Sequence, residues 1–164
     1  MDIISHGLWG GVSFGRSNKK FFIWSFIFGI APDLITFGPF FVLHFSKFYR
    51  QHTNNAQTAL DIPAYIFTSY NFTHSLVVAF IVITIIFLLK KKIVKFLLAW
   101  PLHILMDMPT HSINFFPTPF AWPLFDIKIN GIPWSHPAIF IPNWIALIVA
   151  IGWLYFFSTK QKIS

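Results

Sequence analysis

The chain has 164 residues, of which 55% are hydrophobic and only 10% are charged. Because a soluble domain carries about 25% charged residues, this composition excludes an ordinary soluble domain and predicts one integral membrane domain over residues 1–164. The formal net charge of +7 would suit nucleic acid as well as a membrane surface, but no helix-turn-helix or zinc-finger pattern is present, so we expect no nucleic-acid partner.

The N-terminal part of the chain predicts a short helix followed by a membrane span. Residues 2–15 are moderately apolar, and their glycines would let this helix pack closely against a neighbour. Residues 21–46 are long enough to cross a bilayer. Two proline-containing pairs are expected to break this span: Pro32-Asp33 and Gly38-Pro39. A proline beside a charge inside a membrane segment usually faces protein or a cavity.

The remainder of the chain predicts one polar loop, three further spans and an interfacial loop. Residues 47–72 are polar and are expected to lie outside the hydrocarbon. The next two spans are predicted over 72–89 and 93–108, and the last over 138–157. Residues 109–137 are rich in proline and tryptophan, which favours a loop at the membrane interface. The expected fold is therefore an all-α membrane bundle of four spanning segments plus a short N-terminal helix.

The basic residues indicate how this bundle is oriented. Nine of the twelve lysines and arginines fall on one predicted face: Arg16, Lys19, Lys20, Lys90, Lys91, Lys92, Lys95, Lys160 and Lys162. The positive-inside rule makes that face cytoplasmic, so the N-terminus is expected to point outward.

The strongest candidate site is the pair His103 and Asp107, near the end of the span predicted over 93–108. Residues four apart in a helix project from the same face, so the two side chains could hold one metal ion or hydrogen-bond each other. Pro109 is expected to end the helix near residue 108, because proline removes a backbone hydrogen bond. His111 would then lie in a loop that can fold back towards the pair.

Three further candidate ligands lie in or beside other apolar stretches: His6, Asp33 and His74. At about 1.5 Å per helical residue, all five candidates fall in the middle to outer half of a hydrocarbon core about 30 Å thick. Ionisable groups at such depths are costly and usually functional. Asp33 is the candidate for orienting a catalytic water, because it stands at the expected helix break, where a cavity forms most easily.

Most candidates also have a structural alternative. The His103/Asp107 pair could simply join two helices, and His6 could be exposed near the terminus. His74 could be an interfacial residue beside a helix cap. His111 and His136 are equally well explained as ligands or as loop residues. Two histidines that flank the polar loop are expected to be interfacial: His44 and His52.

The available ligands favour zinc among the divalent metals. The chain has no cysteine, so a metal must be held by histidine, carboxylate, backbone or water. Zinc accepts imidazole nitrogen and aspartate oxygen, and catalytic zinc sites leave a position open. At least four histidines and two aspartates exceed one tetrahedral site, so one or two ions are expected. Two adjacent metals suit the hydrolysis of phosphate esters.

Four short motifs carry a family resemblance: His6 with Gly7 and Gly10, Ala31-Pro32-Asp33, Thr73-His74-Ser75-Leu76, and His103-x-x-x-Asp107 followed by Thr110. In this order they resemble the LexA-binding, inner-membrane-associated family of bacterial metal-dependent hydrolases. The ligand order is also similar to that of zinc-dependent phospholipase C. The resemblance implies a first metal site of Asp33, His74, His103 and Asp107, a second ion on His6 and Asp107, and a role for His111 at a further one.

The chain departs from that family pattern in three respects, one of which is that Tyr70, Asn71 and Phe72 precede Thr73 where family members often have an arginine. Ile35 stands where family members often have a second aspartate, and no glutamate is present to complete a third metal site. The resemblance implies a membrane-bound metal-dependent hydrolase of the bacterial inner membrane. The expected substrate is a phosphate ester in a lipid or lipid-linked molecule, cleaved towards the outer half of the membrane. The alternative is a non-catalytic membrane scaffold that binds metal.

Overall fold

The computed structural model describes the backbone of residues 1–54 and 62–160, and the side chains of residues 1–43 and 62–156. Its elements in chain order are α1 (Ile3–Phe14), α2 (Lys19–Asn54), α3 (Ala64–Thr73), α4 (Leu76–Lys90), the short 3₁₀-helix η1 (Lys95–Leu98), α5 (Ala99–Thr110) and α6 (Pro137–Lys160). The described residues contain no strand, which confirms the all-helical prediction.

The described part has fewer membrane spans than the four predicted. Two helical stretches are long and apolar enough to cross a membrane, Lys19–Leu43 of α2 and Pro137–Phe156 of α6. Helices α3 and α4 meet at a 55° bend and form a third span if they are taken together. The span predicted over 93–108 is wrong, because this stretch folds into η1 and the 12-residue α5. A helix of that length measures about 18 Å, which is shorter than the hydrocarbon core of about 30 Å.

Helix α2 also differs from the expected broken span. It runs continuously from Lys19 to Asn54, with Pro32 and Pro39 inside it. A proline removes one donor from the helical ladder, and the remaining hydrogen bonds on either side can hold the helix together. The break expected beside Asp33 is therefore wrong.

The polar loop predicted over 47–72 is wrong in part, because the end of α2 and all but the last residue of α3 fall within it. Ile66 and Tyr70 of α3 are four residues apart and both buried, so this helix has one face against the rest of the protein. Residues 55–61 lie outside the described residues, as do the side chains of His44 and His52.

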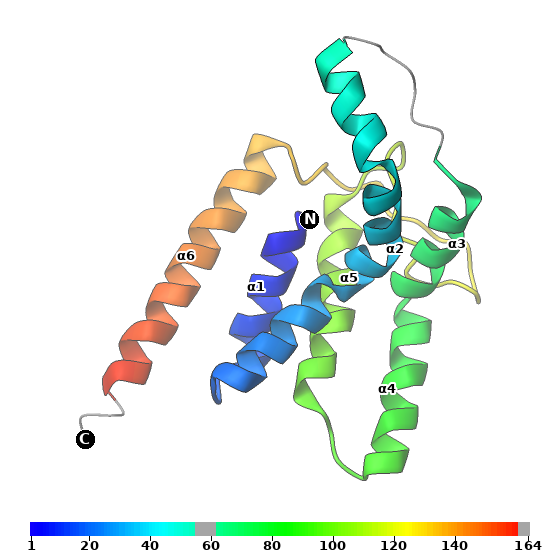
Figure 1. Ribbon diagram of the computed structural model, residues 1–164. Coiled ribbons are helices and arrows are strands. Elements are labelled where there is room, and N and C mark those ends of the chain that lie inside the picture. The colour runs from blue at the N-terminus through cyan, green and yellow to red at the C-terminus, as the bar shows by residue number, and fades with distance from the viewer. Residues whose placement is uncertain (55–61, 161–164) are drawn as a thin grey trace.

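The basic ends of the helices gather at one end of the bundle (Figure 1). The start of α2, the end of α4, the start of α5 and the end of α6 all lie at the lower end of this view, and the N-terminus lies in the upper half. Lys19, Lys90 and Lys160 belong to those helix ends, and Lys95 begins η1, which directly precedes α5. The helix directions thus place these four lysines together, as the charge pattern predicted.

Helix α1 is packed directly onto the backbone of α2. A Cβ added to Gly10 would lie 2.6 Å from the carbonyl oxygen of Ser25, and one added to Gly29 would lie 2.5 Å from the carbonyl oxygen of His6. Both separations are shorter than a van der Waals contact, so only glycine allows the two helices to approach this closely. The glycines of the N-terminal helix therefore have the packing role that the sequence predicted.

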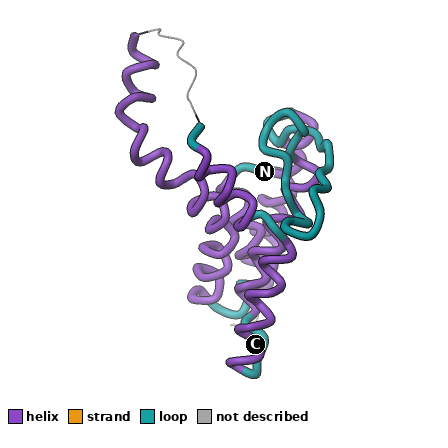
Figure 2. Tube along the Cα trace, turned by 90° about the vertical axis from the view of Figure 1, so that its right-hand side faces the viewer, coloured by secondary structure: helices purple, strands orange, loops and turns teal. Residues whose placement is uncertain are grey.

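Residues 111–136 connect α5 to α6 without a helix, in agreement with the loop expected over 109–137. In Figure 2 this segment, drawn in teal, gathers beside the N-terminus. The last part of this segment lies against the end of α5. There Ile132 N–H donates to the Pro109 carbonyl at 3.0 Å, and Trp134 N–H donates to the Thr110 carbonyl at 2.9 Å. These bonds satisfy carbonyl groups that the end of a helix would otherwise leave open. Helix α5 therefore continues two residues beyond its expected end.

Candidate metal centre

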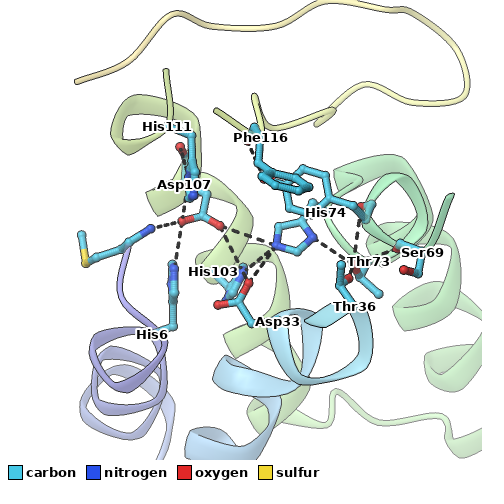
Figure 3. A network of polar contacts seen from close by, with 12 residues as sticks. His6, Asp33, Thr36, Ser69, Thr73, His74, His103, Asp107, His111 and Phe116 are labelled. Carbon is cyan, nitrogen blue, oxygen red and sulfur yellow. Dashed lines mark hydrogen bonds and ion pairs between the residues drawn. The ribbon is translucent and has the colours of Figure 1, made fainter. Parts of the chain in front are cut away.

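Four segments of the chain bring the predicted ligands together (Figure 3). His6 comes from α1, Asp33 from α2, His74 from the bend between α3 and α4, and His103 and Asp107 from α5. One ligand atom from each of the last four residues lies within 4.8 Å of all the others. His6, His74, His103 and Asp107 are buried, while the side chain of Asp33 keeps 16% of its surface exposed.

Nitrogen and oxygen atoms converge at the centre of this group. The Nε2 atoms of His74 and His103 are 3.1 Å apart. His103 Nε2 lies 3.2 Å from Asp107 Oδ2, and His74 Nε2 lies 3.3 Å from Asp33 Oδ1. Both carboxylates therefore face both imidazole rings across a space of a few ångströms.

Hydrogen bonds on the far side of each ring determine which nitrogen faces the centre. His103 Nδ1 lies 2.7 Å from the carbonyl oxygen of Gly29, which can only accept, so we assign the ring proton to Nδ1. His74 Nδ1 lies 2.8 Å from the hydroxyl of Thr73, whose oxygen is also 2.9 Å from the carbonyl of Ser69. With the hydroxyl proton donated to Ser69, Thr73 accepts from His74. Both Nε2 atoms then present a lone pair to the centre.

This assignment explains why one buried carboxylate oxygen has no hydrogen bond. Asp107 Oδ2 is buried and no donor reaches it, although two imidazole nitrogens lie nearby. Four acceptor atoms that face one another without a proton between them repel, and a cation at their centre would remove that repulsion. The imidazole and carboxylate donors suit zinc. These residues therefore fit a divalent metal ion.

The other oxygen of Asp107 faces a second group of side chains. Its Oδ1 lies 2.9 Å from His6 Nε2 and 3.3 Å from His111 Nδ1, and the amino group of Met1 also contacts it. Burial lowers the pKa of His6 to about 4, so its ring is neutral at pH 7 and available as a ligand. Asp107 thus lies between two groups of side chains, one facing each of its carboxylate oxygens.

Burial decides between the ligand and structural interpretations of three histidines. His6 is buried, so it is not an exposed terminal residue. His74 is buried as well, and the helix cap next to it is made by Ser75, whose Oγ accepts from Val78 N–H at 3.2 Å. His136 is exposed and accepts from Ala138 N–H at 3.2 Å, which makes it a loop residue outside the cluster.

Sequence reasoning missed the residues that orient the rings. Thr73 stands directly before His74 in the sequence, and this position was the one available signal for its role. Thr36 of α2 lies behind it, with its hydroxyl oxygen 2.8 Å from that of Thr73. The Gly29 carbonyl belongs to the backbone, so the residue type at this position gives no indication that it orients His103. Such outer partners fix the tautomer and direction of a metal-binding histidine.

An apolar pocket of about 370 Å³ opens beside the cluster. Asp33 and His111 contribute polar groups to its wall. Most other lining residues are apolar, among them Leu34, Phe37, Phe41, Phe116 and Trp134. The pocket therefore connects the exposed edge of the cluster to a surface that suits a hydrocarbon chain.

Comparisons with protein-family models, with curated proteins and with solved structures returned no match to this chain. The resemblance to the inner-membrane hydrolase family stays a prediction. The function is therefore inferred from the residues of the site itself.

Proposed function

We propose that this protein is a membrane-bound metal-dependent hydrolase that cleaves a phosphate ester in a lipid or lipid-linked substrate. The observation that carries the proposal is the convergence of two imidazole nitrogens and two carboxylates beside an apolar pocket. The site holds one or two divalent ions, zinc by preference. It acts in the outer half of the bacterial inner membrane.

The residues divide into two sets around Asp107. Its Oδ2 faces Asp33, His74 and His103, which would hold the first ion, and its Oδ1 faces His6 and His111, which would hold a second. A zinc ion at this place would supply Lewis acidity, which polarises a phosphoryl oxygen and makes a bound water more acidic. The protein itself supplies ligands whose rings are already oriented by Thr73 and Gly29.

Asp33 is the residue proposed to orient the attacking water. The reason differs from the one the sequence offered, because α2 is not broken there. Asp33 is instead the ligand of the first set that retains exposed surface and lines the apolar pocket. A carboxylate in this position can accept a hydrogen bond from a water that enters from the pocket.

The apolar pocket supports a lipid as the substrate. Leu34, Phe37 and Phe41 of α2 line it, and Leu34 and Phe41 are also exposed on the outer surface of the helix. A hydrocarbon chain could lie along these residues while the phosphate reaches Asp33 and His111. Burial of such a chain contributes about 0.8 kcal/mol per CH₂ group, so the pocket would favour a lipid over a soluble phosphate ester.

One observation favours the alternative, a non-catalytic metal-binding scaffold. The first set supplies four protein ligands, and a structural zinc ion is typically held by four protein ligands with no open position. In a scaffold all four side chains would bind the ion permanently. In a hydrolase one position on the ion would open to water or substrate. Asp33 decides between them, because it alone of the four is partly exposed.

Lipid phosphatase assays on purified, zinc-loaded protein test the proposal. Vesicles containing phosphatidic acid, phosphatidylglycerol or an isoprenoid phosphate serve as substrates, and released phosphate or headgroup is measured. We expect turnover of at least one of them, inhibition by a chelator, and in Asp33→Asn a loss of turnover at least as large as the loss of metal. A fully metallated protein that cleaves none of these lipids would favour the scaffold, and full activity in Asp33→Asn would remove Asp33 from the mechanism.

A further inference from the structure

We propose that the basic end of the bundle contains a second binding site, a pocket for the phosphate of an anionic membrane lipid. This site is separate from the metal cluster, because it lies between the turn after α1 and the turn after α4, whereas the cluster lies towards the opposite end of the bundle (Figure 1). It does not depend on the proposed hydrolase activity.

The site is a cavity of about 800 Å³ between two turns that are distant in sequence. Residues 13–14 and 16–18 form one side, and residues 92–96 form the other. Arg16, Lys92 and Lys95 all line it. Basic residues that only orient a protein in the membrane do not need to surround a cavity. Their arrangement around this one indicates a binding site for an anion.

The three cations have no acidic partner in the described structure. No aspartate lines the pocket, and the whole chain contains no glutamate. Arg16 donates from Nε to the Val12 carbonyl at 2.9 Å, which holds its guanidinium group next to the pocket. No described carboxylate forms an ion pair with Arg16, Lys92 or Lys95. An anion in this cavity would therefore meet three uncompensated positive charges, and arginine matches phosphate in geometry as well as charge.

The pocket lies at the level where the apolar stretches end. The candidate span Lys19–Leu43 begins directly after the first turn, and α4 ends at Lys90, directly before the second. Lipid headgroups occupy this boundary between hydrocarbon and water. Basic pockets between helices at such a boundary bind anionic headgroups.

Aromatic rings favour a lipid over a free phosphate ion. Phe14, Phe21 and Phe96 line the same cavity as the three cations, and the rings of Phe21 and Phe96 have their centroids 6.2 Å apart. A free phosphate has no apolar part to contact these rings. A phospholipid could place its phosphate among the cations and the first carbons of its acyl chains against the rings.

Native mass spectrometry of the full chain in a neutral detergent tests this site. Equal amounts of phosphatidylglycerol and phosphatidylcholine are added, and the lipid adducts are counted. We expect the wild type to retain phosphatidylglycerol preferentially. The variant Arg16→Gln/Lys92→Gln/Lys95→Gln should retain at least about tenfold less phosphatidylglycerol, because each basic residue near an anionic headgroup contributes substantially to the attraction.

The matched control removes the same charge from the same end of the protein. Lys19→Gln/Lys20→Gln/Lys90→Gln changes three lysines that do not line the pocket, and it should keep the preference for phosphatidylglycerol. An equal loss in both triple variants, or no loss in either, would overturn the proposal. If the pocket variant does not fold, Lys92→Gln alone decides the question. Lys92 is exposed and has no described bonding partner, and its loss should weaken binding roughly fivefold.

A competition experiment identifies the source of the phosphate. Inorganic phosphate and glycerol phosphate are added at millimolar concentration to the phosphatidylglycerol complex. Survival of the lipid adduct supports the combined use of cations and rings. Displacement by either soluble anion would show that the pocket recognises phosphate alone, and would overturn the assignment to a lipid.

Discussion

The Nε2 atoms of His74 and His103 lie 3.1 Å apart, although 29 positions separate the two residues in the sequence. Neither nitrogen is free to turn away, because Thr73 engages Nδ1 of one ring and Gly29 engages Nδ1 of the other. With both ring protons assigned to Nδ1, two lone pairs face each other, which is unfavourable without a cation between them. The energetic cost of this arrangement is the physical reason to regard it as a metal site rather than as a link between helices.

The orienting role of Thr73 predicts that Thr73→Val weakens metal binding. Valine has a similar shape but cannot accept the Nδ1 proton of His74. Loss of such a partner typically lowers metal affinity by about 10- to 100-fold. Zinc affinity measured by competition with a chromogenic chelator checks this. Thr68→Val is the control, because Thr68 is exposed on the same helix and its one hydrogen bond among the described residues goes to the Ala64 carbonyl. Equal zinc affinity in both variants would show that Thr73 does not position the ring.

The contact between α1 and α2 predicts that Gly29→Ala is harmful. The new Cβ would lie 2.5 Å from the His6 carbonyl oxygen, so α1 must shift and carry His6 away from Asp107. We expect a loss of roughly 1–3 kcal/mol in unfolding free energy together with weaker metal binding. Thermal melting in detergent and metal analysis measure the two effects.

Gly38→Ala is the matched control for this substitution. It lies in the same helix, and its added Cβ would meet nothing within 4 Å. Alanine is a better helix former than glycine by about 1 kcal/mol, so this variant should melt at the same or a higher temperature. If both alanine variants melt and bind metal alike, the close contact at Gly29 has no structural importance.

The arrangement of helix ends predicts that the two loop regions label from opposite sides. Ser17 lies in the turn after α1 and Ser135 lies in the loop before α6, and both are exposed. The chain contains no cysteine, so Ser17→Cys and Ser135→Cys each carry one thiol. A membrane-impermeant maleimide applied to intact cells should label only the position 135 variant. Labelling of both variants under these conditions would contradict the proposed orientation.

The sequence allowed the polar residues of the site to be predicted where they interrupt apolar stretches. His103 and Asp107 are four apart on one helix, and their shared face is a local property that periodicity reveals. Asp33 and His74 stood out because charge inside a membrane segment is costly. Their approach to the pair depends on how α2 and the α3–α4 bend pack against α5, which no local pattern specifies.

Helix lengths were predicted less well than the grouping of Asp33, His74, His103 and Asp107. The sequence over 93–108 is apolar enough for a span, yet only 12 residues form α5, and its buried face includes Pro101 and Ile104. Apolar residues that contact protein cannot be distinguished by composition from those that contact lipid. The continuity of α2 through Pro32 was missed for a related reason, because packing of the surrounding turns decides whether a proline breaks a helix.

Metal analysis of the purified protein tests the central claim most directly. Wild-type protein, His103→Ala and Asp107→Ala are compared by elemental mass spectrometry, with His136→Ala as the control because this exposed side chain lies outside the cluster. We predict at least one zinc or similar divalent ion per wild-type and His136→Ala chain, and a sharp loss in both other variants. Full metal content in His103→Ala and Asp107→Ala, or a wild-type protein that binds no divalent ion when it is supplied, would contradict the account.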